Sequence, residues 1–234
     1  PNRGEALMPS SVVHAAIALL VAAGLLGRFY DRRALAVVLV VVLLPEADTA
    51  LGWVMAGAHR TVLHTMMLSV VAAPALYWET TREGSWIRDR WGDRGVRIAW
   101  VGLFVHTFAH VALDWAHLDG INVFWPIVDR FFNLDGEIYL SASEGLVQTF
   151  VEFSSDPETG GGVIDAGQGG SRVETHVSNP AQPSPDPSPE PVDRRFPIAV
   201  QGWQLYFVLV GAFTLLTKRF QSDPRAESGG ASDD

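Results

Sequence analysis

Five apolar segments restrict what this chain can fold into. They cover residues 11–27, 34–45, 61–78, 96–118 and 198–217. A membrane-spanning helix needs about 20 predominantly apolar residues. The second segment is therefore too short unless it also takes in residues 46–50. We predict an all-α integral membrane protein, a bundle of about five transmembrane helices with a long external loop.

The polar residues divide the chain further. Residues 154–197 are rich in Gly, Pro and Ser, which predicts a flexible, low-complexity external loop. Before this loop we expect a membrane-embedded domain over residues 1–153. After it we expect the final transmembrane helix at 198–220 and a disordered cytoplasmic tail at 221–234.

Two stretches before the loop have their own interpretations. Residues 119–132 are predicted to form a re-entrant or interfacial cover. Residues 137–153 fit an amphipathic helix lying on the membrane, although residues 139–143 would also suit a strand.

Charge and cysteine content exclude several classes of protein. The chain has no cysteine, so any metal must be held by imidazole and carboxylate groups, which suits zinc, manganese or iron. The net charge is −9, and Lys218 is the only lysine among 17 basic residues. This balance indicates a high-salt or GC-rich source. The sequence has no basic patch outside the short loops, and it therefore gives no indication of nucleic-acid binding.

Arginines in the short loops predict the orientation. With five spans, three basic clusters fall on one side of the membrane, which the positive-inside rule makes cytoplasmic. We therefore predict a multi-pass plasma-membrane protein with an external N-terminus and a cytoplasmic C-terminus. The clusters are Arg28, Arg32 and Arg33; Arg82, Arg88, Arg90, Arg94 and Arg97; and Lys218 and Arg219.

Six ionisable residues fall at the external ends of four predicted spans. Ionisable groups are costly in hydrocarbon, so their presence there is a functional hypothesis by default. We predict that they meet at one depth and bind a divalent metal. They are His14 at the start of the first span, Asp48 at the end of the second, His59 and His64 at the start of the third, and His110 and Asp114 near the end of the fourth.

The tightest group reads His106-x3-His110-x3-Asp114-x2-His117. Spacings of four, four and three residues place these side chains along one helical face. His106 is a full turn deeper than His110 and is expected to be a packing residue rather than a ligand. His117 is expected at the membrane interface.

Simpler explanations exist for several of these residues. His14 would also fit a hydrogen bond between helices. Glu46 and Asp48 would fit solvated positions after a helix that stops at Pro45. The segment His59-Arg60-Thr61 would fit a polar helix start with Thr61 as the N-cap.

The order of the motifs resembles the membrane-bound metal-dependent hydrolase family, the YdjM-like inner-membrane hydrolases. The resemblance covers residues 10–130, and Glu46 stands where the family usually has Asp. A weaker likeness, through the His-x3-Asp helix and the early His, is to zinc-dependent phospholipase C. The motifs are His14, Leu44-Pro45-Glu46-Ala47-Asp48, His59-Arg60-x3-His64, His110-x3-Asp114, Gly120 and Trp125-Pro126.

These observations favour a metal-dependent hydrolase that holds one or two ions, most simply zinc, with manganese or iron as alternatives. A bound metal lowers the pKa of its water toward neutrality and makes a nucleophile. Glu46 is the expected general base. Arg60 would pair with an anionic substrate oxygen or, equally, extend to the interface. The depth of the site favours a lipid or lipid-linked phosphoester or ester.

Two other functions compete with hydrolysis. A non-catalytic membrane protein that binds or conducts metal ions or protons should carry ionisable residues through the depth of the membrane, and here they gather at one end. A haem-binding electron carrier using a pair such as His64 and His110 usually has a second pair on the other side, which is not present.

Overall fold

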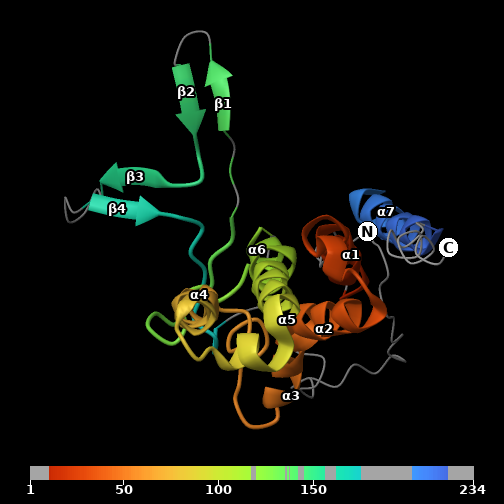
Figure 1. Cartoon of the computed structure of the whole chain (residues 1–234). Coiled ribbons are helices and arrows are strands. Elements are labelled where there is room, and N and C mark those ends of the chain that lie inside the picture. The colour runs from red at the N-terminus through yellow and green to blue at the C-terminus, as the bar shows by residue number, and fades with distance from the viewer. Residues whose placement is uncertain are drawn as a thin grey trace, which may run out of the picture.

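The chain is mostly helical, with two β-hairpins projecting from the group of helices (Figure 1). The computed structural model describes residues 11–116, 120–134, 136, 138–141, 145–155, 162–174 and 202–220. The helices are α1 (Ser11–Leu25), α2 (Arg32–Leu43), α3 (Asp48–Leu51), α4 (Met66–Thr81), α5 (Trp86–Phe104), α6 (Ala112–Trp115) and α7 (Gly202–Phe220), joined by the short helices η1 (Gly27–Phe29), η2 (Leu44–Ala47) and η3 (Val105–Val111).

The second apolar segment forms a continuous helical run with η2 and α3. Asp31 begins it as N-cap, because its carboxylate accepts hydrogen bonds from the backbone N–H groups of Arg33 and Ala34, both at 2.9 Å. Pro45 stands in the first turn of η2, where a missing N–H is tolerated. The run therefore reaches Leu51, as the required span length predicted.

The third apolar segment becomes helical later than predicted. The N-cap of α4 is Thr65, whose hydroxyl oxygen accepts from the N–H of Met67 at 3.2 Å. Thr61 instead donates to the carbonyl of Gly57 at 2.8 Å. The expectation that Thr61 caps this helix was wrong, and residues 61–65 are not helical.

The fourth apolar segment forms α5, η3 and α6 in sequence. Gly92 interrupts α5 with non-helical backbone angles (φ 60°, ψ −159°), so the helical run after this kink, which ends at Trp115, corresponds to the described part of the predicted span at 96–118. Seven residues, Val105–Val111, form a π-helix. Such segments are rare and often occur at functional sites.

Two helices in the described part of the chain are long and apolar enough to span a membrane. They are Arg32–Leu51 and Trp86–Trp115, while α1 and residues Phe207–Leu216 of α7 are shorter apolar helices. The mostly helical character is confirmed. The bundle of five transmembrane helices is not supported beyond these two spans.

Small and β-branched residues pack the helices together. The main core lies between α1, α2, α5 and η3 and includes Ala18, Ala22, Val38 and Val105. Helix α7 lies against α1, so closely that a Cβ added at Gly211 would stand 2.9 Å from the Cα, Cβ and carbonyl oxygen of Ala16. Close backbone approach at small residues is typical of membrane helix packing.

The two hairpins decide between the helix and the strand interpretation of residues 137–153. Strand β1 (Ile138–Ser141) pairs antiparallel with β2 (Gly145–Gln148), and β3 (Glu152–Ser155) pairs antiparallel with β4 (Gly162–Asp165). The strand interpretation of residues 139–143 is therefore right for β1, and the amphipathic helix over 137–153 was wrong.

The predicted division into domains stays a prediction. Strands β1 and β2 belong to the segment assigned to the membrane domain, β3 crosses the predicted boundary after residue 153, and β4 belongs to the segment assigned to the flexible loop. Most of that loop and the tail at 221–234 lie outside the described residues.

Candidate metal centre

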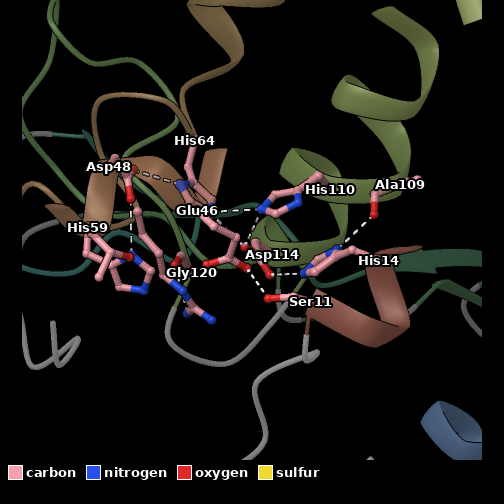
Figure 2. Close-up of polar contacts among 12 residues, drawn as sticks. Ser11, His14, Glu46, Asp48, His59, His64, Ala109, His110, Asp114 and Gly120 are labelled. Carbon is pink, nitrogen blue, oxygen red and sulfur yellow. Dashed lines mark hydrogen bonds and ion pairs between the residues drawn. The ribbon is translucent and has the colours of Figure 1, made fainter. Parts of the chain in front are cut away.

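Three buried side chains from α1, η3 and α6 converge at one end of the helices (Figure 2). They are His14, His110 and Asp114, all buried. One nitrogen or oxygen atom of each lies within 4.8 Å of the others, so the three could hold a metal ion. The structure therefore confirms that ligand candidates from the first and fourth apolar segments lie together.

The His14 ring is fixed by the backbone of the neighbouring π-helix. Its Nδ1 lies 2.8 Å from the carbonyl oxygen of Ala109. A carbonyl can only accept, so Nδ1 donates and Nε2 carries the lone pair of the neutral ring. This Nε2 lies 3.3 Å from Oδ1 of Asp114. Neither atom has a hydrogen-bond partner within the described structure.

His64 joins the group from the loop before α4. Its Nδ1 donates to Oδ2 of Asp48 at 2.8 Å, which leaves the lone pair on Nε2. This Nε2 lies 3.2 Å from Oδ2 of Asp114 and 3.1 Å from Nε2 of His110. A fourth lone-pair donor therefore faces the same small volume.

The His110 ring is held between two other imidazoles. It stacks on His14 with ring centroids 4.0 Å apart and planes 18° apart, and it contacts His64 at 4.9 Å. Its Nε2 lies 3.6 Å from Oδ2 of Asp114. The stacking aligns the two rings so that each presents one edge to the carboxylate.

Asp48 lies behind His64, on the side away from Asp114. Its side chain is 0% exposed, and its Oδ1 accepts from Nδ1 of His59 at 3.1 Å. Thr49 is a further contact of that nitrogen, also at 3.1 Å. One carboxylate thus contacts both predicted histidines of the loop. A carboxylate that accepts from the far nitrogen of an imidazole orients the ring and raises its basicity as a metal ligand.

Glu46 lies at the edge of the group, on η2 (Figure 2). Its Oε1 accepts from the hydroxyl of Ser11 at 3.1 Å, and its charge acts on His14. It is half-buried. Glu46 therefore combines a link to α1 with partial access to solvent.

Arg60 lies inside the protein and does not extend to an interface. It is 2% exposed and has a left-handed backbone (φ 59°), which is uncommon outside glycine. Its Nη1 lies 3.4 Å from the carbonyl of Gly120, and its charge acts on Asp114. A buried cation is therefore held close to the acidic ligand.

Residues 120–134 lie against the ligand-bearing loop. The backbone N–H of Asn122 donates to the carbonyl of Arg60 at 2.9 Å, and the N–H of Met66 donates to the carbonyl of Val123 at 3.0 Å. The Thr65 hydroxyl, at 2.8 Å, adds a further bond to Val123. Residues 120–134, called the cover below, therefore pack against the loop that carries His59 and His64.

Residues 162–174 contact the cover and the loop beneath it. Phe132 pairs with both Ile121 and Gln168 as isolated bridges. Arg172 contacts Asp129 at 3.3 Å and donates to the carbonyl of Ala56 at 3.0 Å. Part of the segment predicted to be flexible is thus tied to the loop that carries His59 and His64.

Some features of the site had no signal in the sequence. The hydroxyl groups of Thr49 and Ser11 were not singled out, and no residue pattern marks the π-helix. His106 is half-buried on this helix and is not one of the three converging ligands. His117 and His176 lie outside the described residues.

These features define a mostly helical protein of membrane-spanning character with a buried histidine–carboxylate cluster. A family model described as YdjM inner membrane protein matches residues 8–166, more than half of the chain, so the chain belongs to the YdjM inner membrane protein family. The resemblance seen in the motifs is confirmed for the family. Neither a curated protein nor a solved structure matches the chain.

Proposed function

We propose that this chain is a membrane-embedded metal-dependent hydrolase. One observation supports this most strongly. The lone pairs of His14 and His64 both face the carboxylate of Asp114, at 3.3 and 3.2 Å, with no hydrogen atom between them if the rings are neutral. Acceptors held at this distance repel one another unless a cation lies among them.

The donor set suits a divalent metal. His14, His64, His110 and Asp114 would hold it, and three imidazoles with one carboxylate match the ligands that zinc prefers, with manganese or iron as alternatives. Asp48 and His59 offer ligands for a second ion. When bound, such a metal lowers the pKa of a water molecule toward neutrality and supplies a nucleophile.

Two further residues have the chemistry to complete the reaction. Glu46 would accept the proton of the attacking water, because its carboxylate lies beside the ligand group and is only half-buried. Arg60 would bind an anionic oxygen of the substrate, since a buried guanidinium offers several donors in a fixed plane. We assign Glu46 the role of general base and Arg60 that of substrate binding.

The substrate class follows from the position of the site. His14 begins α1, Asp48 ends the run that starts at Arg32, and Asp114 ends the run that starts at Trp86. Under the predicted orientation, with an external N-terminus and a cytoplasmic C-terminus, this end would lie at the external headgroup level. We therefore propose a lipid or lipid-linked substrate with a scissile phosphoester or ester bond.

Metal analysis of the full chain purified in detergent tests the first step. We expect bound zinc or manganese in the parent and near-complete loss in His110→Ala and Asp114→Ala. The control is His106→Ala, from the same helix, which should keep its metal. Circular dichroism shows whether each variant keeps its helices. Unchanged metal content in both ligand variants would overturn the proposal.

A hydrolysis screen tests the second step. The metal-loaded protein is incubated with phospholipids and lipid-linked phosphates, and release of phosphate or fatty acid is measured. Metal-dependent release supports the hydrolase. Metal binding without turnover of any of them would favour a non-catalytic metal-binding or ion-conducting protein.

A further inference from the structure

A cavity lined by two arginines lies at the end of the helices opposite the metal centre. It has a volume of about 610 Å³ and is bounded by the end of α1, η1 and the middle of α5. Arg28 and Arg97 line it from these two sides, and Trp100 stands beside Arg97. Two cations from separate helical segments thus share one cavity.

An apolar groove continues from this cavity between α4 and α5. Its volume is about 530 Å³, and Leu25, Arg97 and Trp100 line both spaces. Val70, Phe104 and other apolar side chains form most of its walls. The hydroxyls of Ser69 and Thr107 are hydrogen-bonded to each other at 2.8 Å, which reduces the polarity of this wall.

The charges in the cavity are available to an anion. Arg28 lies 4.8 Å over the ring of Phe29, and within the described part of the chain neither Arg28 nor Arg97 pairs with a carboxylate. Asp93 also lines the cavity, but Arg88 neutralises it. The cavity therefore presents net positive charge.

We propose that the cavity and groove together bind one anionic phospholipid. The phosphate would lie between Arg28 and Arg97, and one acyl chain would lie along the groove. From Arg97 to Phe108 the groove follows α5 and η3 for about 16 Å at 1.5 Å per residue. This length is about half the hydrocarbon thickness of a bilayer, the depth that one acyl chain occupies.

An amphiphile explains both spaces, whereas a free phosphate would use only the first. A cationic pocket between membrane helices is a recognised way to bind lipid headgroups. The site is separate from the metal centre and does not depend on the proposed hydrolysis. A lipid bound there would hold α1, α4 and α5 together from the side that lacks the histidine–carboxylate cluster.

Lipid titration followed by native mass spectrometry tests the charged part of the site. The probes are phosphatidylglycerol and phosphatidylcholine with the same acyl chains, added to the full chain in detergent. We expect tighter binding of phosphatidylglycerol, weakened about fivefold by Arg28→Gln and about fivefold by Arg97→Gln. Arg90→Gln removes the same charge from an exposed position of α5 that lines neither space, and should change nothing.

A pair of neighbouring substitutions tests the groove. Val70→Trp would fill it, while Val71→Trp adds the same side chain to a similarly exposed position of α4 that does not line it. We expect only Val70→Trp to weaken binding. Equal binding of both lipids, equal effects of Arg97→Gln and Arg90→Gln, or full binding by Val70→Trp would each overturn the proposal.

Discussion

The two ends of the helices differ in how deeply their ionisable side chains are buried. At one end, histidines and carboxylates from four segments are buried and contact one another directly. At the other, arginines are partly exposed, and their ion pairs lie at the surface, as between Arg94 and Asp31 at 2.7 Å. Buried acceptors that face one another are costly unless a proton or a cation lies between them, whereas exposed pairs are worth little to stability.

Asp48 and Asp31, one from each end, illustrate this difference in burial. Asp48 is 0% exposed, while the side chain of Asp31 is 49% exposed. Partial burial alone would raise the pKa of Asp31. Hydrogen bonds from the N–H of Ala34 and from Arg94 outweigh this and hold the pKa below its ordinary value. Asp31 is thus a cap and surface partner, and Asp48 orients the rings of the candidate metal centre.

The largest effect should come from the proposed base. Glu46→Gln keeps the size of the side chain and removes its ability to take a proton. We expect the metal content to stay and the rate of hydrolysis to fall by about 10² to 10⁴. Glu83→Gln, at an exposed position near the opposite end, should leave the rate unchanged. Full activity of Glu46→Gln would remove this residue from the mechanism.

The same substitution at the two aspartates sharpens the contrast between the ends. Asp48→Asn weakens the acceptor behind His64 and His59. We expect metal affinity to fall by about 10- to 100-fold, as for other carboxylates that orient metal-binding histidines. Asp31→Asn should leave the affinity unchanged. Metal titration by calorimetry measures both, and equal affinities would show that Asp48 does not act through the rings.

A smaller effect is expected where α7 meets α1, two residues from His14. Gly211→Ala places a Cβ 2.9 Å from the backbone of Ala16, so one helix must shift. We expect a loss of about 1–3 kcal/mol in the free energy of unfolding. Gly24→Ala is the control, because an added Cβ there has no neighbour within 4 Å. Comparable unfolding transitions in detergent would contradict the close packing.

The smallest effect belongs to the exposed aspartate. Because the folded pKa of Asp31 is lowered, its stabilising contribution is present above the ordinary pKa of an aspartate and is lost as the pH falls through the folded value. Asp31→Asn keeps a cap acceptor but loses the charge. We expect under about 1 kcal/mol of destabilisation at pH 7, and we expect this difference to shrink as the pH falls below the ordinary pKa of an aspartate. A pH-independent difference would contradict the role of the charge.

The convergence of ligands could be predicted from the sequence because two independent patterns agreed. Hydrophobic length predicted the spans, of which two are long and apolar enough in the described part of the chain, and the arginines predicted which helix ends share a side. His14, Asp48, His110 and Asp114 then had to share one end, and they do. The extension of the second span through residues 46–50 followed from length alone.

Other features of the fold could not be predicted from the sequence, because they depend on contacts between segments that are distant along the chain. Helix α4 begins at Met66, after Thr65, whose single hydroxyl hydrogen faces the carbonyl oxygens of Val123 and Trp125, both at 2.8 Å; no local pattern can indicate this contact. The left-handed backbone of Arg60 is likewise supported by a hydrogen bond from the cover. The hairpins arise from pairing between short strands of mixed polar and apolar residues, a composition that suits several structures.

The π-helix at Val105–Val111 gives the ligand helix a property that ordinary α-helical periodicity lacks. Each of its turns holds more residues, so the segment after it is rotated relative to the segment before it. If these seven residues took regular α-helical winding instead, the positions after them, Asp114 included, would be rotated about the helix axis relative to α5. The face of this helix that carries His110 and Asp114 is therefore phased against the preceding turns of α5 by the local winding.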